Sequence, residues 1–404
     1  MESAEKGVEE SSGREGRHVV FLINSRFPYH SGGRETWLHN VLEQLAAREY
    51  RLSVLALRPK RSSTQFFNVP SDVEIMQAGT LHEVRSLAWM LHSYGGLMSV
   101  AYYVYRMKRI LSRKLDDSDG TTIICLDTVL AATAARKAKR TQPNTRLIIS
   151  CRGFAARGLA RRYPIVGTVF RRLECLALDA ADEIWTNGAD TQEHYTAMGY
   201  HPIMIGNGVD VERLSEAGHD RRSRYSGERF RILSVATLRR IKGVEALIRA
   251  ASLLARLTQQ DFEIVLAGKG DATRYAALAA TLGIKDRVQF LGERDDVPEL
   301  MAEADIVTCL SGGGGMSMAG LEAMAAGTTI VAWDSPVYRQ TLTHRRTGLL
   351  VPAWDEQALA EALAEVMADY QSFRSMGRRA QQEAWNYDWS VIAERVIERL
   401  DGMA

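Results

Sequence analysis

Hydrophobic and polar positions along the first half of the chain predict β-strands and α-helices in alternation. Continuous apolar runs of strand length are typical of strands that are buried on both faces of a parallel sheet. Such runs lie at residues 18–24, 52–57, 122–126 and 146–151, and residues 182–187 (DEIWTN) are a further predicted strand. The segment TWLHNVLEQLAAREY, between the first two runs, has apolar residues on one helical face: Leu38, Val41, Leu42 and Leu45. We therefore expect a doubly wound α/β domain.

The second half repeats this alternation after a polar junction. IGNGVD at residues 205–210 and the charged stretch 212–229 separate the halves. Helical segments such as VEALIRAASLLAR and VPELMAEA then alternate with predicted strands at 231–238, 262–268, 288–292, 306–310 and 328–332. Ligands of such sheets bind outside the carboxyl ends of the strands. We therefore predict two Rossmann-like doubly wound domains that face a central cleft.

The most informative stretch is a glycine-rich turn in the second half. Residues 304–333 contain a strand, four glycines at 312–315, a helix over 317–326 and a second strand. Glycines at such a turn let backbone N–H groups approach a ligand, and the helix N-terminus favours an anion. Glu322, one helical turn further on, can accept hydrogen bonds from a pair of ribose hydroxyls. The alternative, a tight turn of small residues for close packing, stays open on this stretch alone.

A second pair of glycines precedes the first amphipathic helix. Gly32 and Gly33 stand at its predicted N-terminus, where backbone amides can again meet an anion. A plain turn explains them equally well. Neither half opens with the GxGxxG-to-acid pattern of dinucleotide-binding domains, which argues against a general Rossmann-type oxidoreductase.

Composition adds limits on the class of protein. The 404 residues are 46% hydrophobic and 25% charged, and their formal net charge of +2 argues against a nucleic-acid-binding protein as a whole. The four cysteines show no metal-ligand spacing, so we expect reduced, mostly buried thiols of a cytosolic protein. Residues 1–16 are expected to form a disordered tail rather than a signal or transit peptide. No apolar stretch reaches the roughly 20 residues that a bilayer requires.

Two stretches of the first half are basic and free of acidic residues. Residues 84–114 carry six basic and five aromatic residues, and residues 152–173 carry six arginines. They are either ordinary helices that bury an apolar face or a surface that rests on anionic lipid headgroups. The acidic run at 116–119 suggests a metal site at first sight, but we interpret it as a solvated loop.

Six motifs together resemble one known family. GGRE, NGVD, KG, LAGKGD, VQFLG and LEAMAAG follow one another in the order and spacing of the retaining glycosyltransferases of the two-domain GT-B type, family 4. The resemblance covers residues 18–400 and implies a helix over 385–400 that crosses back to the first domain. The implied acceptor-binding domain is 17–202 plus 384–404, and the implied nucleotide-sugar-binding domain is 203–383.

The resemblance also implies roles for single residues. Glu322 matches the glutamate that binds the donor ribose, and Lys242 matches the lysine that contacts the donor diphosphate and stabilises the leaving group. Arg152, where the family has a histidine, completes the implied catalytic set. The implied donor-binding residues are Gly32, Gly33, Asn207, Thr237, Arg239, Lys242, Gly268, Gly292, Gly314, Gly315, Met316, Ser317 and Glu322.

The chain departs from the family pattern at three positions. The first glutamate of the family's E-x7-E element would fall at Gly314, and the arginine before the lysine would fall at Thr237. The histidine position falls near Arg152. Arg239, Arg240 and Arg152 are the neighbouring residues that could supply the missing positive charge.

We interpret the chain as a retaining glycosyltransferase that moves a hexose from a UDP- or GDP-sugar to a hydroxyl group in the synthesis of an envelope polysaccharide, glycolipid or glycoconjugate. The implied acceptor is a glycan, a lipid-linked molecule or a small molecule. No cofactor beyond the donor, no metal and no nucleic acid is expected. The expected location is cytoplasmic, with a peripheral position on an anionic membrane surface at the inner face of the plasma membrane as a further hypothesis. Gly314 and Thr237 motivate the alternative, a non-catalytic GT-B subunit or nucleotide-sugar-binding partner of another glycosyltransferase.

Overall fold

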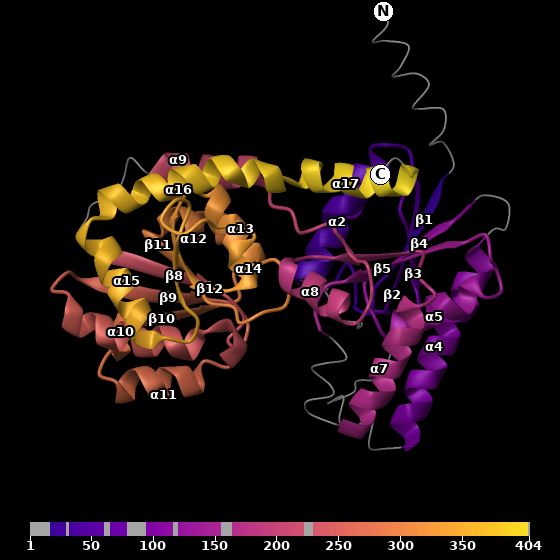
Figure 1. The fold of residues 1–404 in the computed structure, drawn as a ribbon, viewed down its shortest axis with the longest axis horizontal. Helices are drawn as coiled ribbons and strands as arrows, with labels where there is room; N and C mark the ends of the chain where they lie inside the picture. The colour runs from indigo at the N-terminus through magenta and orange to yellow at the C-terminus, as the bar shows by residue number, and fades with distance from the viewer. Residues whose placement is uncertain are drawn as a thin grey trace, which may run out of the picture. The chain divides into compact units, whose positions relative to one another are not determined.

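The computed structural model describes residues 17–29, 32–59, 65–78, 94–115, 120–154, 164–221 and 229–402. The chain forms two compact units, each with its own sheet (Figure 1). The N-terminal unit comprises Met1–Asn187, Thr191–Ile205 and Ile392–Ala404, and the C-terminal unit comprises Gly188–Asp190 and Gly206–Val391. Both sheets are parallel, which confirms the predicted α/β class.

The N-terminal unit has a seven-stranded sheet in the order β3-β2-β1-β4-β5-β6-β7. Its strands are β1 (His18–Leu22), β2 (Arg51–Ala56), β3 (Glu74–Gln77), β4 (Thr122–Cys125), β5 (Arg146–Cys151), β6 (Glu183–Thr186) and β7 (Ile203–Met204). Its helices are α2 (Gly33–Ala46), α4 (Tyr94–Lys114), α5 (Leu130–Lys139), α7 (Pro164–Leu178) and α8 (Ala189–Ala197). The order of the strands reverses between β1 and β4, which is a topological switch point.

The predicted elements of this unit differ from the observed ones mainly at the edges. The four apolar positions predicted for one face of α2 are all fully buried, but α2 begins at Gly33, three residues before the predicted segment. The edge strands β3 and β7 were not predicted, because EIMQ and the two-residue β7 lack a long apolar run. Within 84–114 the structure describes a single helix, α4, whereas residues 79–93, 116–119 and 155–163 lie outside the described residues.

The C-terminal unit has a six-stranded sheet in the order β10-β9-β8-β11-β12-β13, with its switch point between β8 and β11. Its strands are β8 (Phe230–Val235), β9 (Phe262–Ala267), β10 (Val288–Gly292), β11 (Ile306–Cys309), β12 (Thr329–Asp334) and β13 (Leu349–Pro352). Its α-helices are α9 (Val211–Arg221), α10 (Val244–Leu257), α11 (Thr273–Thr281), α12 (Val297–Glu303), α13 (Met318–Ala325), α14 (Pro336–Arg339), α15 (Glu356–Ala368) and α16 (Tyr370–Ala384). Short 3-10 helices lie at η1 (Arg240–Lys242), η2 (Lys285–Arg287) and η3 (Trp385–Tyr387).

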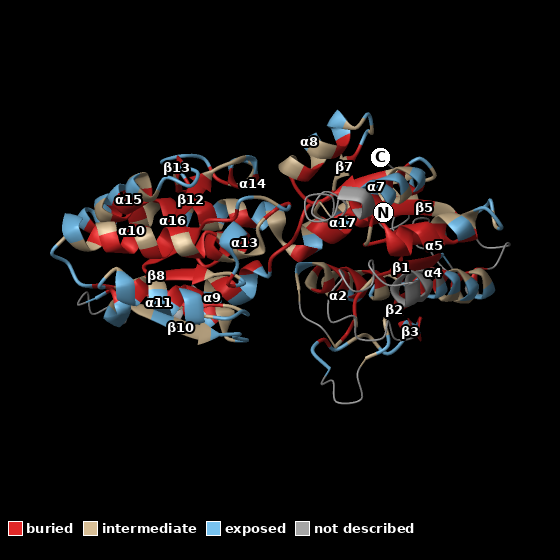
Figure 2. Ribbon diagram, turned by 90° about the horizontal axis from the view of Figure 1, so that it is seen from below, coloured by how far each residue is buried: buried red, intermediate tan, exposed pale blue. Residues whose placement is uncertain are grey.

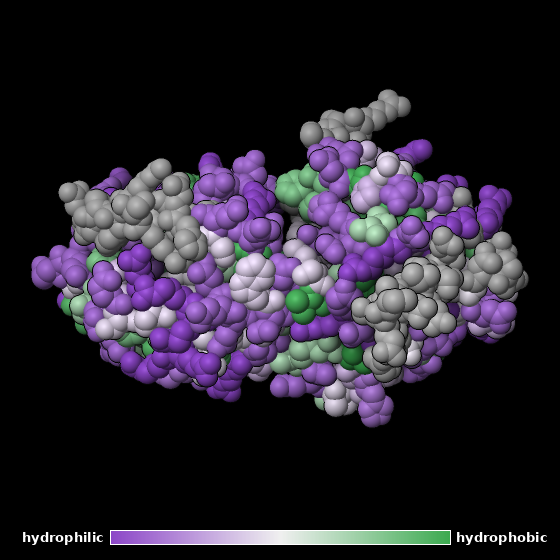
Figure 3. Space-filling model, turned by 90° about the horizontal axis from the view of Figure 1, so that it is seen from above, coloured by the Kyte–Doolittle hydropathy of each residue, from purple (hydrophilic) through white to green (hydrophobic). Residues whose placement is uncertain are grey.

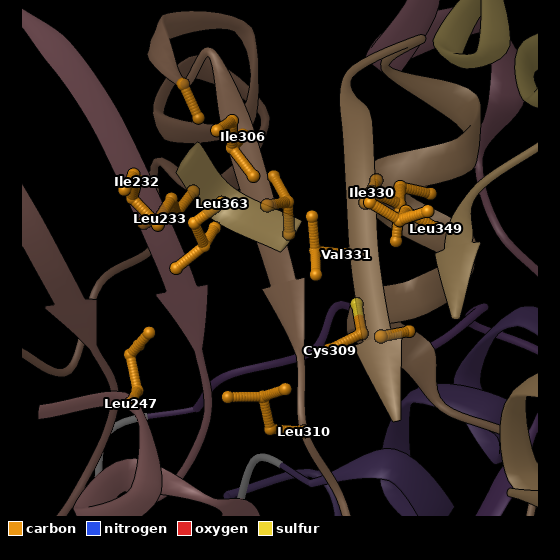
Figure 4. Packing of buried hydrophobic residues seen from close by; sticks show 14 of the residues in the cluster. Ile232, Leu233, Leu247, Ile306, Cys309, Leu310, Ile330, Val331, Leu349 and Leu363 are labelled. Atoms are coloured by element: carbon orange, nitrogen blue, oxygen red, sulfur yellow. The ribbon is translucent and has the colours of Figure 1, made fainter. Parts of the chain in front are cut away.

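Each sheet is the centre of a hydrophobic core. In Figure 4, Leu233 of β8, Val331 of β12 and Leu363 of α15 lie among the packed side chains of the C-terminal unit, and all three are fully buried. Figure 2 shows that the strands of both units are largely buried. The face drawn in Figure 3 is mostly hydrophilic where it is described. All four cysteines are free, and Cys125, Cys151 and Cys309 are buried. None of the described helices has an apolar stretch long enough to cross a bilayer.

The C-terminal helix α17 (Trp389–Asp401) returns to the N-terminal unit, which Ile392 and the residues after it join. The Tyr50 hydroxyl donates to the Asp401 carboxylate at 2.7 Å, and Arg399 donates to Glu183 at 3.1 Å. Arg17 adds an ion pair to Asp401 at 3.0 Å. The predicted helix that crosses back to the first domain is therefore confirmed, and Figure 1 shows it beside α2 and β1.

Candidate functional site

The switch point of the C-terminal unit brings two loops together. β8 and β11 are neighbouring parallel strands, so the loops that follow them meet at one edge of the sheet. The Gly312 N–H donates to the Ile241 carbonyl at 2.8 Å, and the Lys242 ammonium donates to the Ser311 hydroxyl at 3.1 Å. Lys242 therefore lies against the glycine-rich loop, although about 70 residues separate them in the sequence.

The glycine-rich loop adopts a backbone conformation that favours glycine at three consecutive positions. Gly313, Gly314 and Gly315 have φ angles of 141°, 110° and 89°. Side chains other than hydrogen are strained there. Ser317 then caps α13, because its hydroxyl accepts a hydrogen bond from the Gly320 N–H at 3.2 Å. The loop thus presents backbone amides at a helix N-terminus, which is a suitable arrangement for an anion.

Two of these backbone amides already donate hydrogen bonds to a carboxylate that the sequence did not predict there. Asp190, in the first turn of α8, accepts hydrogen bonds from the Gly314 N–H at 2.8 Å and the Gly315 N–H at 3.0 Å. Asn207, which the resemblance assigns to donor binding, is buried and donates to the Met316 carbonyl at 2.8 Å. Nothing in the sequence links Asp190 to the loop. Its one local signal is an acidic residue at a helix N-terminus, which is common.

Glu322 lies in the second turn of α13 and is half-buried. Burial raises the pKa of its carboxyl group from 4.5 to about 7. Among the described residues the carboxylate has no hydrogen-bond partner, so its acceptor atoms are available to a ligand. The nearby Cys309 thiol has its pKa raised to about 12, first by burial and then by Glu322, and is therefore not a candidate nucleophile.

Positive charge gathers on the loop after β8. Burial lowers the pKa of Lys242, and the neighbouring Arg239 lowers it further. Arg239 and Arg240 are both exposed, and so is Thr237, whose side chain carries no charge. The positive charge of Arg239 therefore acts on Lys242.

Gly268 and Gly292 have a structural explanation. Gly268 has a φ of 152°, and a Cβ atom there would lie 2.0 Å from the Ala236 carbonyl oxygen. Its N–H donates to the Gly292 carbonyl at 2.7 Å. The packing interpretation of a glycine turn therefore applies to Gly268, whereas a Cβ atom on Gly292 would meet nothing within 4 Å and this glycine is favoured by its φ of 70°.

An apolar edge borders the first glycine of the loop. The side chains of Trp354 and Ile241 are 48% and 43% exposed, and both approach the place where a Gly312 side chain would stand. Trp354 has a φ of 68°, an unfavourable value for a tryptophan. A half-exposed aromatic ring in this position offers a face on which a sugar ring or a base can stack.

The remaining predicted residues belong to the N-terminal unit. The Arg152 guanidinium, just after β5, lies 3.8 Å from the centre of the Trp37 ring of α2, and its Nε donates to the Ser150 hydroxyl at 3.1 Å. Burial lowers the pKa of Arg152, and so does the nearby Arg34. Gly33 is the first residue of α2 and Gly32 directly precedes it, so the structure brings Arg152 together with the N-terminal part of that helix. The described residues contain no group of three or more His, Cys, Asp or Glu side chains that could hold a metal ion.

Both halves of the chain match known family models. Residues 32–208 match the glycosyl transferase 4-like domain, and residues 218–383 match the glycosyl transferases group 1. Among curated proteins, a phosphatidyl-myo-inositol mannosyltransferase of Mycolicibacterium smegmatis is 32% identical over 213 residues, which are 50% of this chain and 52% of the relative. The chain spans about half the length of the curated relatives it matches.

Solved structures share the whole fold. Sucrose-phosphate synthase from Thermosynechococcus elongatus has a TM-score of 0.78 at 18% identity, over 96% of this chain and 100% of that chain. Anabaena HepE in complex with UDP-glucose has a TM-score of 0.73 at 19% identity, over 95% and 99%. At these identities the likeness concerns the fold alone. The chain therefore carries one segment that matches the glycosyl transferase 4-like domain, followed by one that matches the glycosyl transferases group 1, on a fold that it shares with these solved structures.

Proposed function

We propose that the protein is a retaining glycosyltransferase that transfers a hexose from a nucleoside diphosphate sugar to a hydroxyl group. The observation that supports this most directly is the switch point between β8 and β11. There, Lys242, the loop amides and the Glu322 carboxylate belong to one edge of one sheet. Ligands of doubly wound folds bind at such a point.

The chemistry follows from these groups. Lys242 and the amides at the α13 N-terminus complement a diphosphate, and Glu322 complements the hydroxyl groups of the ribose. During transfer the bond between the anomeric carbon and the diphosphate oxygen breaks, and the diphosphate leaves with the bonding electrons. The acceptor oxygen forms the new bond to the anomeric carbon, and its proton passes to the departing diphosphate. Positive charge placed beforehand at the leaving group stabilises the transition state more than the ground state. Retention of the anomeric configuration is carried over from the family resemblance.

The donor and the acceptor are proposed as classes. A UDP- or GDP-sugar is the proposed donor, and UDP-glucose is bound in the HepE structure. A lipid-linked acceptor agrees with the name of the mannosyltransferase relative, while a glycan or small-molecule acceptor uses the same chemistry. The wider role, in the synthesis of an envelope polysaccharide, glycolipid or glycoconjugate, belongs to this proposal.

A membrane-facing surface on α4 is part of the same proposal. Tyr102, Tyr105, Arg109 and Arg113 are all exposed at intervals of three and four residues, so they form one stripe along the helix. The opposite face is buried through Tyr103, Met107 and Leu111. Aromatic and basic side chains together suit the headgroup region of an anionic membrane. The proposed location is therefore the cytoplasm, with the protein at the inner face of the plasma membrane.

A second candidate function rests on the two substituted positions. Gly314 and Thr237 lack the charged side chains of the family pattern, which favours a non-catalytic GT-B subunit or a nucleotide-sugar-binding partner of another glycosyltransferase. Binding alone does not separate the two candidates, because both use Lys242 and Glu322. Turnover does.

Nucleotide binding and turnover test the proposal. UDP, GDP and their sugars are titrated in thermal unfolding of the wild type, Lys242→Ala and Glu322→Ala, with the exposed Lys285→Ala as the control. At 100 times its dissociation constant, a ligand adds about 2.7 kcal/mol to the free energy of unfolding. We expect one nucleotide to stabilise the wild type and the control, and neither site variant. Release of nucleoside diphosphate with a defined product anomer identifies an enzyme. No stabilisation by any nucleotide would contradict the enzyme and the nucleotide-sugar-binding partner, and would favour a non-catalytic subunit without a donor site.

A further inference from the structure

The loop amides that the proposed donor site needs already hold a carboxylate. One Asp190 oxygen accepts from the Gly314 N–H at 2.8 Å, and the other accepts from the Gly315 N–H at 3.0 Å. Hydrogen bonds to an ionised acceptor are about twice as strong as neutral ones. The arrangement therefore shows that this loop binds an anion, and that the protein supplies one itself.

The segment that carries Asp190 is fitted closely to the loop. A Cβ atom on Gly188 would lie 2.5 Å from the Met316 nitrogen, so only glycine allows this approach. The Ala189 N–H donates to the Gln340 side chain at 2.9 Å. These contacts aim the Asp190 carboxylate at the amides of Gly314 and Gly315. Gly188–Asp190, which include the first two residues of α8, belong to the C-terminal unit together with the loop.

A diphosphate and this carboxylate cannot use the same two amides at once. Each amide has a single hydrogen to donate, and two anions at this separation repel each other. Lys242 and the N-terminus of α13 favour negative charge in this region. That charge comes from Asp190 or from a ligand.

We propose that Asp190 is an internal competitor of the donor: it occupies the amides of Gly314 and Gly315 until the donor diphosphate displaces it. The inference rests on the proposed function, since it takes a nucleoside diphosphate as the displacing anion. It predicts that the apparent dissociation constant equals the intrinsic one divided by the fraction of molecules whose amides are free. Asp190 thereby sets the donor affinity without taking part in the chemical step.

Calorimetric titration with UDP and GDP tests this role. Asp190→Asn keeps the size of the side chain but removes its charge and one of its two acceptor oxygens. Asp190→Ala is the second variant, in case the amide disturbs folding. Glu193→Gln removes the same charge from an exposed position on the same helix and is the matched control. Thermal unfolding checks that each variant is folded.

The competitor role predicts that Asp190→Asn and Asp190→Ala bind the nucleotide about 3- to 10-fold more tightly than the wild type and Glu193→Gln. Hydrogen exchange gives an independent measure at Gly314 and Gly315. Without nucleotide their amides should exchange faster in the Asp190 variants, and with saturating nucleotide the difference should disappear.

Two results would count against the inference in different ways. Unchanged or weaker nucleotide binding by the Asp190 variants, with binding by the wild type intact, would overturn the competitor role and make Asp190 a positioning residue for the loop. If no nucleotide bound to the wild type, Glu193→Gln or the Asp190 variants, the proposed function itself would fail. The control and the wild type therefore distinguish the two failures.

Discussion

Glu322 shows how a single residue links burial to pH. Its pKa of about 7 lies above the ordinary value of 4.5, because burial disfavours the ionised form. Between these values the folded chain keeps a proton that the unfolded chain has lost. The contribution of this group to stability is therefore complete below about pH 4.5 and is lost as the pH rises through about 7. Ribose binding needs the ionised carboxylate, so it is favoured at higher pH, where the contribution of this group to stability is lost.

At this scale we predict opposite pH trends for stability and nucleotide binding. Nucleotide affinity of the wild type should rise from pH 6 to pH 8, by about tenfold per pH unit at most below the pKa, because ionised Glu322 accepts from the ribose. Glu322→Gln should bind more weakly with a flatter profile, and its stability relative to the wild type should increase over the same pH range. Calorimetry and urea unfolding measure the two quantities. Glu361→Gln, exposed on α15, is the control, and identical profiles in Glu322→Gln and the wild type would refute the assignment.

Helix α16 shows how an element depends on one close approach. Gly377 lies on its buried face, and a Cβ atom there would lie 2.4 Å from the Gly327 carbonyl oxygen and 2.9 Å from the Thr328 carbonyl oxygen. Both neighbours are backbone atoms of the turn after α13, so they cannot rotate away as a side chain can. The residue thereby fixes the distance between α16 and the end of the helix that carries Glu322.

At the scale of the element we predict that Gly377→Ala destabilises the C-terminal unit by about 1–2 kcal/mol. Overpacking costs about 1–3 kcal/mol, and two backbone oxygens within 3.0 Å place this change in the upper part of that range, at about 2–3 kcal/mol. The better helix propensity of alanine offsets roughly 1 kcal/mol of this cost. Urea unfolding followed by fluorescence gives the change. Gln371→Ala, at an exposed position of the same helix, should be neutral or slightly stabilising. A Gly377→Ala protein as stable as the wild type would show that α16 can shift outward freely.

The low net charge of the whole chain does not reflect a local excess of basic residues. The net charge is only +2, yet residues 84–114 hold six basic residues and no acidic one. Attraction between the proposed α4 surface and an anionic membrane therefore depends on a few side chains rather than on the total charge. Such an attraction falls off within a Debye length, about 10 Å at 0.1 M salt.

At the scale of the whole molecule we predict salt-sensitive binding to vesicles that contain anionic lipid. Each basic side chain near the surface contributes about 1 kcal/mol, so Arg109→Ser with Arg113→Ser should weaken binding by tenfold or more. Vesicle sedimentation measures the bound fraction. Lys137→Ser with Arg140→Ser, at exposed positions in and directly after α5, removes the same charge as a control. Binding that is absent, or equal in both double variants, would exclude the proposed surface.

The sequence by itself determined the elements and the fold class. Apolar runs and helical periodicity are local properties, so they predicted most of the observed strands, the buried face of α2 and the strand–turn–helix around the glycines. The motifs likewise directed attention to Lys242 and Glu322. Short edge strands such as β3 were not predicted, because a four-residue strand with polar ends has no distinctive pattern.

Only the tertiary structure decided which distant residues meet. Strand order placed β8 beside β11 and so brought Lys242 to Ser311, 69 positions away in the chain. Packing also stacked Arg152 on Trp37 and joined the Asp190 carboxylate to the Gly314 amide across 124 positions. Such contacts depend on how many segments pack at once, and no local pattern encodes them. The sequence therefore predicted an anion-binding loop, whereas only the structure revealed which carboxylate of the chain contacts it.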